Sequence, residues 1–404
     1  MTNRIDYVSV ENNEILSSNL ILRFIKEKKV IFIQNKSNIL YSLLNPLDLD
    51  GPAVILMSSG SSMKPKLCIH PISNLDKSAE ASGIWLKDQG FDLSNCIIFN
   101  TLPLNHISGL MPLWRSKVWH CKYINITPDL IKSSKELIDF SLTLKNIHKK
   151  QLITSLVPTQ LYRLLKEKNG KEWLRMFDLI WVGGSKLSNN LFKICKKEKI
   201  NLAPCYGSTE TAAMVTSLKP KEFLYGYENY GKVLKDVNLR INNEGIIEIQ
   251  SERIGYELKS NSKIKSFTKS DGWWESGDYG ELTTIDNNEY LNVIGRRDNA
   301  FNSGGETIFP DIIKSRVNEF IIDQEIPIQD FRIFKTKDET WGNRYELIIN
   351  FSNNLKQNDI EKFLNQLKTF SKNWPRHERP KKWRVEIDKS KLTNSSKVNW
   401  KNSI

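Results

Sequence analysis

Short apolar runs alternate with amphipathic segments between about residue 50 and residue 208. Five runs have the length and composition of buried strands: 53–57, 96–100, 152–158, 178–184 and 201–207. Between the runs the apolar positions follow a helical spacing, as in 74–89, where Ser73 is a candidate N-cap. Because helices join parallel strands, this alternation predicts an α/β fold of parallel sheets covered by helices.

The pattern changes after residue 230, where apolar and polar residues alternate in steps of two, as in 245–251. That period predicts antiparallel strands and therefore a β-rich portion. From residue 298 onward the pattern predicts a small α+β unit with helices over 311–320 and 357–372. We therefore expect a large N-terminal domain over 1–297 and a small, mobile C-terminal domain over 298–404.

Composition narrows the class of protein. The chain has 404 residues, 39% of them hydrophobic and 26% charged, which is typical of a globular protein. No apolar stretch approaches the ~18 residues that cross a membrane, and the N-terminus lacks the pattern of a signal peptide. The five cysteines show no CxxC spacing, which favours reduced thiols over disulfides or a zinc site. We therefore expect a cytoplasmic protein without a membrane span.

The net charge of +13 has two interpretations. An electropositive surface attracts nucleic acids or small anions such as nucleotides and CoA, whereas scattered lysines only solvate the surface. Basic clusters such as 196–199 and 380–382 are short, and no nucleic-acid-binding motif lies beside them. We therefore favour scattered lysines and predict no nucleic-acid partner.

The polar segment MSSGSSMKPK, residues 57–66, directly follows the first apolar run. Its serine hydroxyls are donors, Gly60 lets backbone N–H groups come close, and Lys66 adds a positive charge, which together suit a triphosphate. No Gly-Lys-Ser/Thr sequence closes the segment, so it is not a Walker A loop. Taken alone, the serines favour a solvated polar turn. Further polar clusters follow the fourth and fifth runs, and ligands of parallel sheets bind at the carboxyl ends of strands.

These clusters belong to an ordered set of motifs along the chain. The set comprises SSGSSMKPK (58–66), PLNHISGL (103–110), VGGSKLS (182–188), CYGSTET (205–211), SGD (276–278) and GRRDNAFNSGGETIFPDII (295–313). In this order the motifs resemble the core motifs of the adenylate-forming acyl- and aryl-CoA synthetases. TNSSKVNWK (393–401) resembles the C-terminal lysine motif of that family. The resemblance extends from about residue 52 to the end of the chain.

The resemblance implies the family's fold and its two-step reaction. A carboxylate attacks the α-phosphate of ATP to give an acyl-adenylate and diphosphate, and the CoA thiol then displaces AMP. The family implies Mg²⁺ as cofactor and an aromatic carboxylic acid, ATP and CoA as partners, and it leaves the oligomeric state open. Residues 102–116 and 153–165 look most like the o-succinylbenzoate–CoA ligases of menaquinone and phylloquinone biosynthesis. The alternatives are a ligase for another acid and a non-catalytic or nucleic-acid-binding relative.

Residues of the matched motifs take family roles by resemblance. The ATP-binding set is Ser58, Ser59, Gly60, Ser61, Ser62, Lys66, Tyr206, Gly207, Thr209, Asp278 and Arg296. Glu210 is the implied Mg²⁺ ligand, since a hard cation that bridges phosphates needs a carboxylate. Each residue also has a structural alternative: a helix N-terminal acid for Glu210, an ordinary turn for Asp278, and a salt bridge for Arg296.

The implied acyl-substrate set is His106, Arg115, Gly183, Gly184 and Ser185. His106 orients or donates to acyl oxygens, and the glycines make room for the acid. o-Succinylbenzoate has a second carboxylate, and we hypothesise that Arg115 or a nearby serine binds it. The alternatives are a buried structural histidine and a plain surface ion pair.

The remaining implied residues act with the small domain. Lys397 completes the catalytic set with His106 and Glu210, and it enters the site only for adenylation. Asp298 stands at the hinge, and Gly304 and Gly305 line the CoA channel. This chain departs from the family at three positions where family members commonly have glycine. The residues at these positions are Met63, Leu67 and Ser396. The loss of glycine at 63 and 67 reduces the freedom of the loop to move.

Overall fold

The computed structural model describes residues 2–3, 5–10, 14–35, 47–49, 51–58, 66–259, 263–324, 326–351 and 355–386. Contacts divide the chain into a large unit of residues 1–187, 191–276 and 280–293 and a small unit of residues 188–190, 277–279 and 294–404. The functional division into 1–297 and 298–404 stays a prediction. Among the described residues, no helix has both the length and the apolar character needed to span a membrane.

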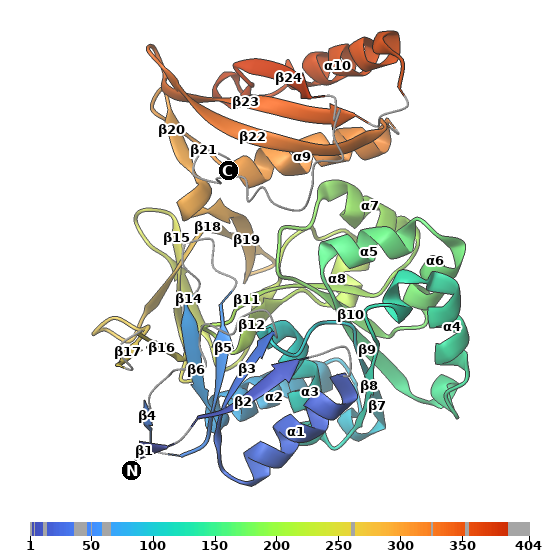
Figure 1. Cartoon of the computed structure of the whole chain (residues 1–404), viewed down its shortest axis with the longest axis vertical. Helices are drawn as coiled ribbons and strands as arrows, with labels where there is room; N and C mark the ends of the chain where they lie inside the picture. Colours follow the sequence, from blue (N-terminus) through green and yellow to red (C-terminus); the bar gives the residue numbers. More distant parts are fainter. Residues whose placement is uncertain are drawn as a thin grey trace. The chain divides into compact units, whose positions relative to one another are not determined.

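A seven-stranded sheet organises the large unit, in the order β13-β12-β11-β10-β9-β7-β8 (Figure 1). Its strands are β7 (Cys96–Asn100), β8 (Lys122–Asn125), β9 (Gln151–Leu156), β10 (Leu179–Val182), β11 (Leu202–Ser208), β12 (Ala213–Ser217) and β13 (Lys232–Val233). The five strands from β8 to β11 are parallel, and β12 and β13 are antiparallel additions. Four of the five apolar runs are therefore confirmed as strands of one parallel sheet.

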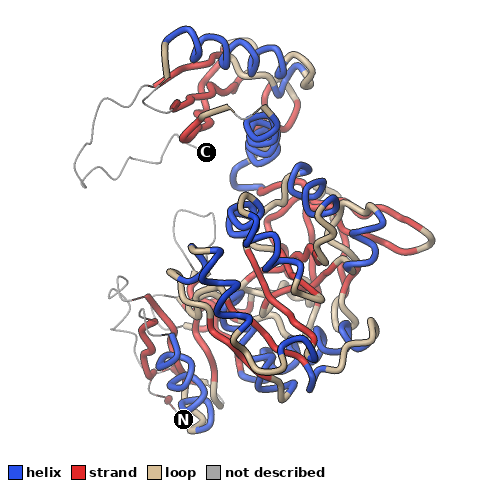
Figure 2. Tube along the Cα trace, turned by 90° about the vertical axis from the view of Figure 1, so that its right-hand side faces the viewer, coloured by secondary structure: helices blue, strands red, loops and turns tan. Residues whose placement is uncertain are grey.

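Helices cover both faces of this sheet (Figure 2). On one face lie α4 (Ser134–Leu142), α5 (Pro158–Leu165), α6 (Lys168–Arg175) and α7 (Asn189–Lys197), and on the other lie α2 (Ile72–Lys87) and α3 (Ile107–Trp119). Ile97 and Phe99 of β7 join the first core, and Cys96 and Ile98 join the second, because successive strand residues point to opposite faces. Burial of both faces explains why these strands are continuous apolar runs. The short helix α8 (Pro220–Tyr225) follows β12.

The first apolar run, 53–57, lies in a different sheet of the same unit. This six-stranded sheet has the order β17-β16-β6-β5-β3-β2. Its elements are β2 (Ile5–Val10), α1 (Glu14–Lys26), β3 (Val30–Asn35), β5 (Ala53–Met57), β6 (Leu67–Pro71), β16 (Tyr256–Leu258) and β17 (Ile264–Ser266). β5 is parallel to β3 and antiparallel to β6, because the chain returns beside β5 after the loop 58–66. Helix α3 contributes to the cores of both sheets.

Helix α2 begins two residues earlier than the sequence predicts. Pro71 is its N-cap residue, with φ −50° and ψ 145°, and its fixed φ ends β6 at this point. Ser73 therefore falls inside the first turn, and the prediction that it caps the helix is wrong.

Antiparallel strands complete the fold, as the two-residue period predicts. A four-stranded sheet contains β14 (Asn238–Ile241), β15 (Ile246–Gln250), β18 (Trp274–Ile285) and β19 (Asn288–Arg296), and β1 (Thr2–Asn3) pairs with β4 (Leu47–Asp48). The small unit contains β20 (Phe301–Ser303), β21 (Glu306–Ile308), α9 (Pro310–Asp323), β22 (Ile328–Asp338), β23 (Gly342–Phe351), α10 (Gln357–Ser371) and β24 (Lys382–Glu386). Phe320 of α9 stacks on Phe370 of α10 with ring centroids 4.4 Å apart, which packs the two helices together.

Candidate functional site

The turn after β10 is the first element of the site. Gly184 has φ +84°, the left-handed conformation that favours glycine. A Cβ atom on Gly183 would lie 3.0 Å from Cys205 Sγ and 3.1 Å from Cys205 O, so glycine permits the close approach of β10 to β11. Ser185 is exposed. The turn therefore presents backbone groups and one hydroxyl at the carboxyl end of a parallel strand.

Tyr206 and Gly207 lie at the carboxyl end of β11, which has a bulge between them, and Thr209 and Glu210 lie in the turn that follows. A Cβ atom on Gly207 would lie 2.2 Å from Ala213 O, so only glycine fits there. Tyr206 and Thr209 are each 9% exposed. Glu210 is half-buried in a four-residue turn that leads into β12. No helix begins at this turn, so the alternative of a helix N-terminal acid is wrong.

A buried histidine ties this turn to β6. His70 is fully buried, and its Nε2 lies 2.7 Å from Thr209 O. Burial lowers the pKa of His70 to about 4, so the ring is neutral at pH 7 and its Nε2–H donates to the Thr209 carbonyl. Because β6 directly follows the predicted phosphate loop, this hydrogen bond joins the strand after that loop to the turn that contains Thr209 and Glu210. His70 was not among the site residues predicted from the sequence, although a lone histidine inside the apolar run LCIHP could have indicated it.

A buried arginine fixes the far side of the same turn. Arg253 is fully buried; it donates to Ser78 Oγ at 2.8 Å and to Met214 O at 2.8 Å. Its Nε forms an ion pair with Asp236 at 2.8 Å. Ser78 in turn donates to Ala212 O, where the backbone has the left-handed φ of +51°. The turn is therefore held by side chains that the sequence analysis also missed, and nothing local in the sequence distinguishes them.

The predicted phosphate loop is described only at its two ends. Ser58 is 4% exposed, its N–H donates to Lys66 O at 2.8 Å, and its Oγ accepts from Lys66 N at 3.2 Å. These two bonds close the base of the loop, and Lys66 is exposed. The other loop residues named above lie outside the described residues: Ser59, Gly60, Ser61, Ser62 and Met63.

His106 occupies the N-cap position of α3. It is exposed, so the alternative of a buried structural histidine is wrong. Partial desolvation lowers the pKa of His106, which favours the neutral imidazole at pH 7. Ile107 and Leu110 of α3 share a core cluster with Ala212, so the start of this helix packs near the turn after β11.

Arg115 of α3 is buried, with 4% of its surface exposed. Its Nε donates to Ser82 Oγ at 3.0 Å, and its guanidinium lies 4.6 Å from the centroid of the Trp181 ring. Burial lowers the pKa of Arg115 to about 9, and its positive charge opposes the rise in pKa that burial causes at the Cys205 thiol, whose Sγ would lie 3.0 Å from a Cβ atom on Gly183. No carboxylate of the described chain pairs with Arg115, so the alternative of a surface ion pair is wrong. A buried cation without an anionic partner is costly unless a ligand supplies one.

Two predicted ATP ligands of the small unit pair with each other. Arg296 Nε lies 3.0 Å from Asp278 Oδ1, and Asp278 is 6% exposed. The salt bridge that the sequence analysis gave as the alternative for Arg296 is therefore present. This contact fixes the position of the Asp278 carboxylate.

The other small-unit residues fall at turns. Asp298 is exposed in a short 3₁₀ turn, Arg297–Asn299, directly after β19. Gly304 and Gly305 join β20 to β21 with φ +62° and +91°. A Cβ atom on Gly304 would lie 2.4 Å from Trp341 Cε3, whereas one on Gly305 would meet open space. Lys397 and Ser396 lie outside the described residues.

Within the described part of the chain, no group of three or more His, Cys, Asp and Glu side chains is placed to hold a metal ion. Glu210 is a single half-buried carboxylate, and its backbone O accepts from Gly255 N at 2.8 Å. One carboxylate is what a Mg²⁺ ion needs when phosphate oxygens and waters complete its shell. The residues present therefore fit a nucleotide-bound Mg²⁺ and not a metal site made by protein alone.

We expect His70 to make stability depend on pH. Its pKa of about 4 lies below the ordinary 6.5, so this contribution is complete above pH 6.5 and is lost as pH falls toward 4. The loss amounts to about 3 kcal/mol of unfolding free energy. His70→Gln keeps an N–H donor but does not titrate, and its urea unfolding should lack this pH dependence. The exposed His148→Gln is the control. If wild type and His70→Gln share one pH profile, His70 does not titrate as proposed.

The chain is similar in sequence to known proteins. A family model described as "AMP-binding enzyme" matches residues 9–252. The 2-succinylbenzoate–CoA ligase of Listeria monocytogenes serovar 1/2a is 30% identical over 301 residues, which is 74% of this chain and 60% of that protein. The ligase of the same name from Geobacillus sp. (strain WCH70) is 27% identical and covers 72% of this chain and 57% of its own length. The chain thus spans about 60% of the length of its first curated relatives.

Solved structures share the fold. The o-succinylbenzoate CoA synthetase of Bacillus subtilis, in complex with the acyl-adenylate intermediate OSB-AMP, superposes with a TM-score of 0.72 at 18% identity, over 95% of this chain and 84% of that one. The same enzyme in complex with ATP and a magnesium ion gives a TM-score of 0.68 at 17% identity, over 95% and 86%. These likenesses confirm the predicted α/β fold class.

Proposed function

The chain belongs to the AMP-binding enzyme family, and from that premise we propose that it is an ATP-dependent, AMP-forming acid–CoA ligase. Its proposed reaction converts 2-succinylbenzoate, ATP and CoA to 2-succinylbenzoyl-CoA, AMP and diphosphate, as a step of menaquinone or phylloquinone biosynthesis. The names of the curated relatives support this substrate. The observation that carries the activity is the His70–Thr209 hydrogen bond, because it joins β6, the strand that follows the phosphate loop, to the turn that holds Glu210.

In the first half-reaction a carboxylate oxygen of the acid bonds to the α-phosphorus of ATP, and the bond from that phosphorus to the diphosphate leaving group breaks. Negative charge develops on the phosphate oxygens, so the site needs donors and cations. We assign the triphosphate to Lys66 and the loop serines, and the α-phosphate to Thr209. The adenine and ribose are assigned to the remaining ATP residues: Tyr206, Gly207, Asp278 and Arg296.

We assign Mg²⁺ to Glu210, whose single carboxylate suits an ion shared with phosphates. When bound, the ion neutralises charge on the phosphate oxygens. The chain contributes the position of that carboxylate, because His70 fixes the carbonyl before it and Gly255 N fixes the carbonyl of Glu210 itself.

The acid is assigned to the space between the turn after β10 and the start of α3. Gly183 lines this space with its backbone, Gly184 leaves room for the aromatic ring, and Ser185 and His106 donate to acyl oxygens. Arg115 binds the carboxylate that is not activated. Its burial and its lack of a carboxylate partner support this assignment, since an anionic ligand removes the cost of the buried charge.

In the second half-reaction the CoA sulfur bonds to the acyl carbon, the bond from that carbon to AMP breaks, and the thiol proton is released. We assign ATP and acid binding to 1–297 and a mobile lid to 298–404, with Gly304 and Gly305 at the CoA channel. The two glycines are exposed at a turn with positive φ, so their backbone can come close to a ligand.

Asp298→Pro is expected to separate the two half-reactions. Asp298 lies in an exposed 3₁₀ turn, where a hinge absorbs the change in φ and ψ, and proline fixes φ. The variant should retain acid-dependent diphosphate release and lose most thioester formation, measured by two separate assays. Asp298→Ala is the control and should retain both. Equal loss of both half-reactions in the proline variant, with retained folding, would remove the hinge assignment.

The activity is tested by product analysis of the purified full chain. Incubation with 2-succinylbenzoate, ATP, Mg²⁺ and CoA should give AMP and a thioester with the mass of 2-succinylbenzoyl-CoA. Omission of CoA should leave the acyl-adenylate bound. A chain that forms neither product from this acid would refute the proposed reaction.

A further inference from the structure

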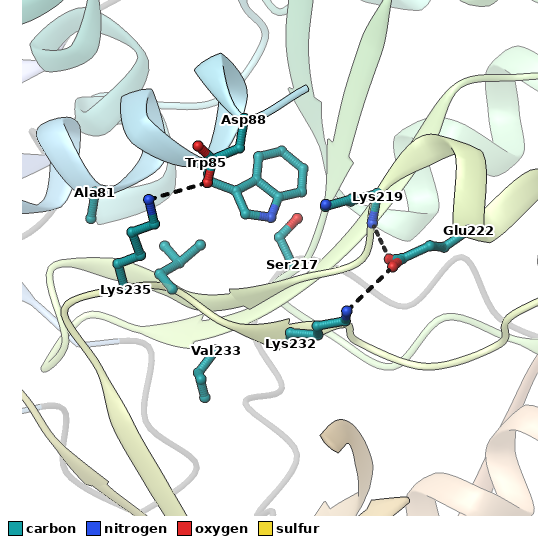
Figure 3. A pocket seen from close by; sticks show the side chains of 10 residues that line it. Ala81, Trp85, Asp88, Ser217, Lys219, Glu222, Lys232, Val233 and Lys235 are labelled. Carbon is teal, nitrogen blue, oxygen red and sulfur yellow. Dashed lines mark hydrogen bonds and ion pairs between the residues drawn. The ribbon is translucent and has the colours of Figure 1, made fainter. Parts of the chain in front are cut away.

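A pocket lies in the large unit, and none of the residues assigned above lines it. Its volume is about 110 Å³, and it lies between the C-terminal end of α2 and the edge strand β13 (Figure 3). Its lining residues are Ala81, Trp85, Asp88, Ser217, Lys219, Glu222, Lys232, Val233, Leu234 and Lys235. None of them takes a role in the proposed reaction, so the pocket needs a separate explanation.

Two nearly buried donors line the pocket. Ser217 is 2% exposed, and its Oγ has no hydrogen-bond partner among the described residues. Trp85 is 9% exposed, and its indole also lines the pocket. A buried hydroxyl without a partner costs free energy, and native proteins avoid such groups unless a ligand or water satisfies them. These donors therefore indicate an acceptor-rich occupant.

Three lysines surround the same pocket, and their charges are poorly neutralised. Lys219 is half-buried, and no carboxylate of the described chain pairs with it. Lys235 lies 3.4 Å from Asp88, in a pair whose side chains are 68% and 50% exposed. Exposed ion pairs of this kind contribute little to the free energy of folding. The Nζ of Lys232 lies 3.9 Å from Oε1 of Glu222, which is a long separation for an ion pair.

Glu222 is already engaged by other groups. Its Oε2 accepts from the backbone N–H of Lys219 at 3.1 Å, and its Oε1 accepts from the Tyr290 hydroxyl at 3.0 Å. The carboxylate thus fixes the pocket wall, and its 3.9 Å separation from Lys232 Nζ is longer than a charge-assisted hydrogen bond. Three ammonium groups face two carboxylates, so the pocket has a net charge of +1.

We propose that this pocket binds a phosphate-type oxyanion. Lys219 and Lys232 supply charge-assisted donors, and Ser217 and the Trp85 indole supply neutral donors to its oxygens. The volume corresponds to roughly four water molecules, which suits one phosphate group and excludes a whole nucleotide. The anion is inorganic phosphate or the phosphate group of a nucleotide whose remainder stays outside. This inference does not depend on the proposed ligase reaction.

Calorimetric titration of the full chain with inorganic phosphate, at ionic strength held constant with potassium chloride, tests the proposal. Wild type should bind one equivalent, and Lys219→Met should weaken binding by about tenfold or more, because one charge-assisted contact is lost. Lys122→Met is the matched control, since Lys122 is an exposed lysine on β8, at the opposite edge of the same sheet. It should bind as wild type does.

Ser217→Ala supplies a second readout that is independent of charge. It removes the unpartnered hydroxyl, so it should keep or raise stability in urea and still weaken phosphate binding. A titration with AMP separates the two sources of the phosphate group. If Lys219→Met weakens the binding of inorganic phosphate, the ligand is a free anion. If it weakens only the binding of AMP, the ligand is the phosphate group of a nucleotide. Binding that neither pocket variant changes, or that only Lys66→Met weakens, overturns the proposal.

Discussion

Arg115→Met is expected to raise the KM for 2-succinylbenzoate by about 100-fold, because loss of one partner from a buried charge pair costs 2–5 kcal/mol. The guanidinium is buried over Trp181, beside Ser82, without a carboxylate partner in the described chain. Methionine keeps most of the side-chain volume and removes the charge. The KM for ATP should stay unchanged, because the proposed ATP ligands are other residues.

The substrate analogue benzoylpropionate, which lacks the ring carboxylate, makes this test specific. Its kinetics should be the same in wild type and Arg115→Met, because it has no second carboxylate to bind. Lys117→Met is the control variant: Lys117 lies on the same helix, with its Nζ 4.6 Å from the centroid of the Trp114 ring, but it is exposed. If Arg115→Met leaves the KM for 2-succinylbenzoate within the range of the Lys117 variant, Arg115 does not bind the substrate.

Lys397→Ala is expected to slow adenylation by roughly three orders of magnitude. By resemblance, this lysine lies against the carboxylate and phosphate oxygens during the first half-reaction. A unit charge ~4 Å from a developing anion contributes about 4 kcal/mol at an effective dielectric constant near 20. The variant should still convert a supplied acyl-adenylate and CoA to the thioester, because the lysine takes no part in that step.

The two half-reactions must be measured separately for Lys397→Ala. Diphosphate release reports adenylation, and consumption of supplied acyl-adenylate reports thioester formation. Lys401→Ala, which changes a lysine four residues later, controls for loss of positive charge in this segment. Equal loss of both half-reactions in Lys397→Ala would contradict the assignment of the lysine to adenylation alone.

The strands of the parallel sheet were predictable from the sequence, but the pairing of the first run was not. Residues 96–100 form β7 as predicted, because a continuous apolar run bounded by polar residues marks a strand buried on both faces. The run 53–57 has the same local pattern, yet β5 lies in another sheet and pairs antiparallel with β6. Local pattern predicts a strand; which strand it pairs with depends on contacts between distant segments.

The same distinction separates the site residues that were predicted from those that were missed. Gly183, Gly207 and Glu210 belong to contiguous motifs, so the order of motifs indicates them. His70 acts on Thr209 across 139 residues of sequence. For Arg115 the sequence left open a surface ion pair, whereas the structure buries the cation without a carboxylate partner in the described chain. This burial likewise results from packing between separate elements.

Acid-dependent release of diphosphate, measured with and without CoA over a panel of acids, tests the central claim most directly. The panel consists of 2-succinylbenzoate, benzoylpropionate, benzoate and a fatty acid. An adenylating acid–CoA ligase for 2-succinylbenzoate should release diphosphate with that acid at the highest kcat/KM, and CoA should raise the turnover. Release that is faster with another acid would contradict the substrate, and no release with any acid would contradict the activity itself.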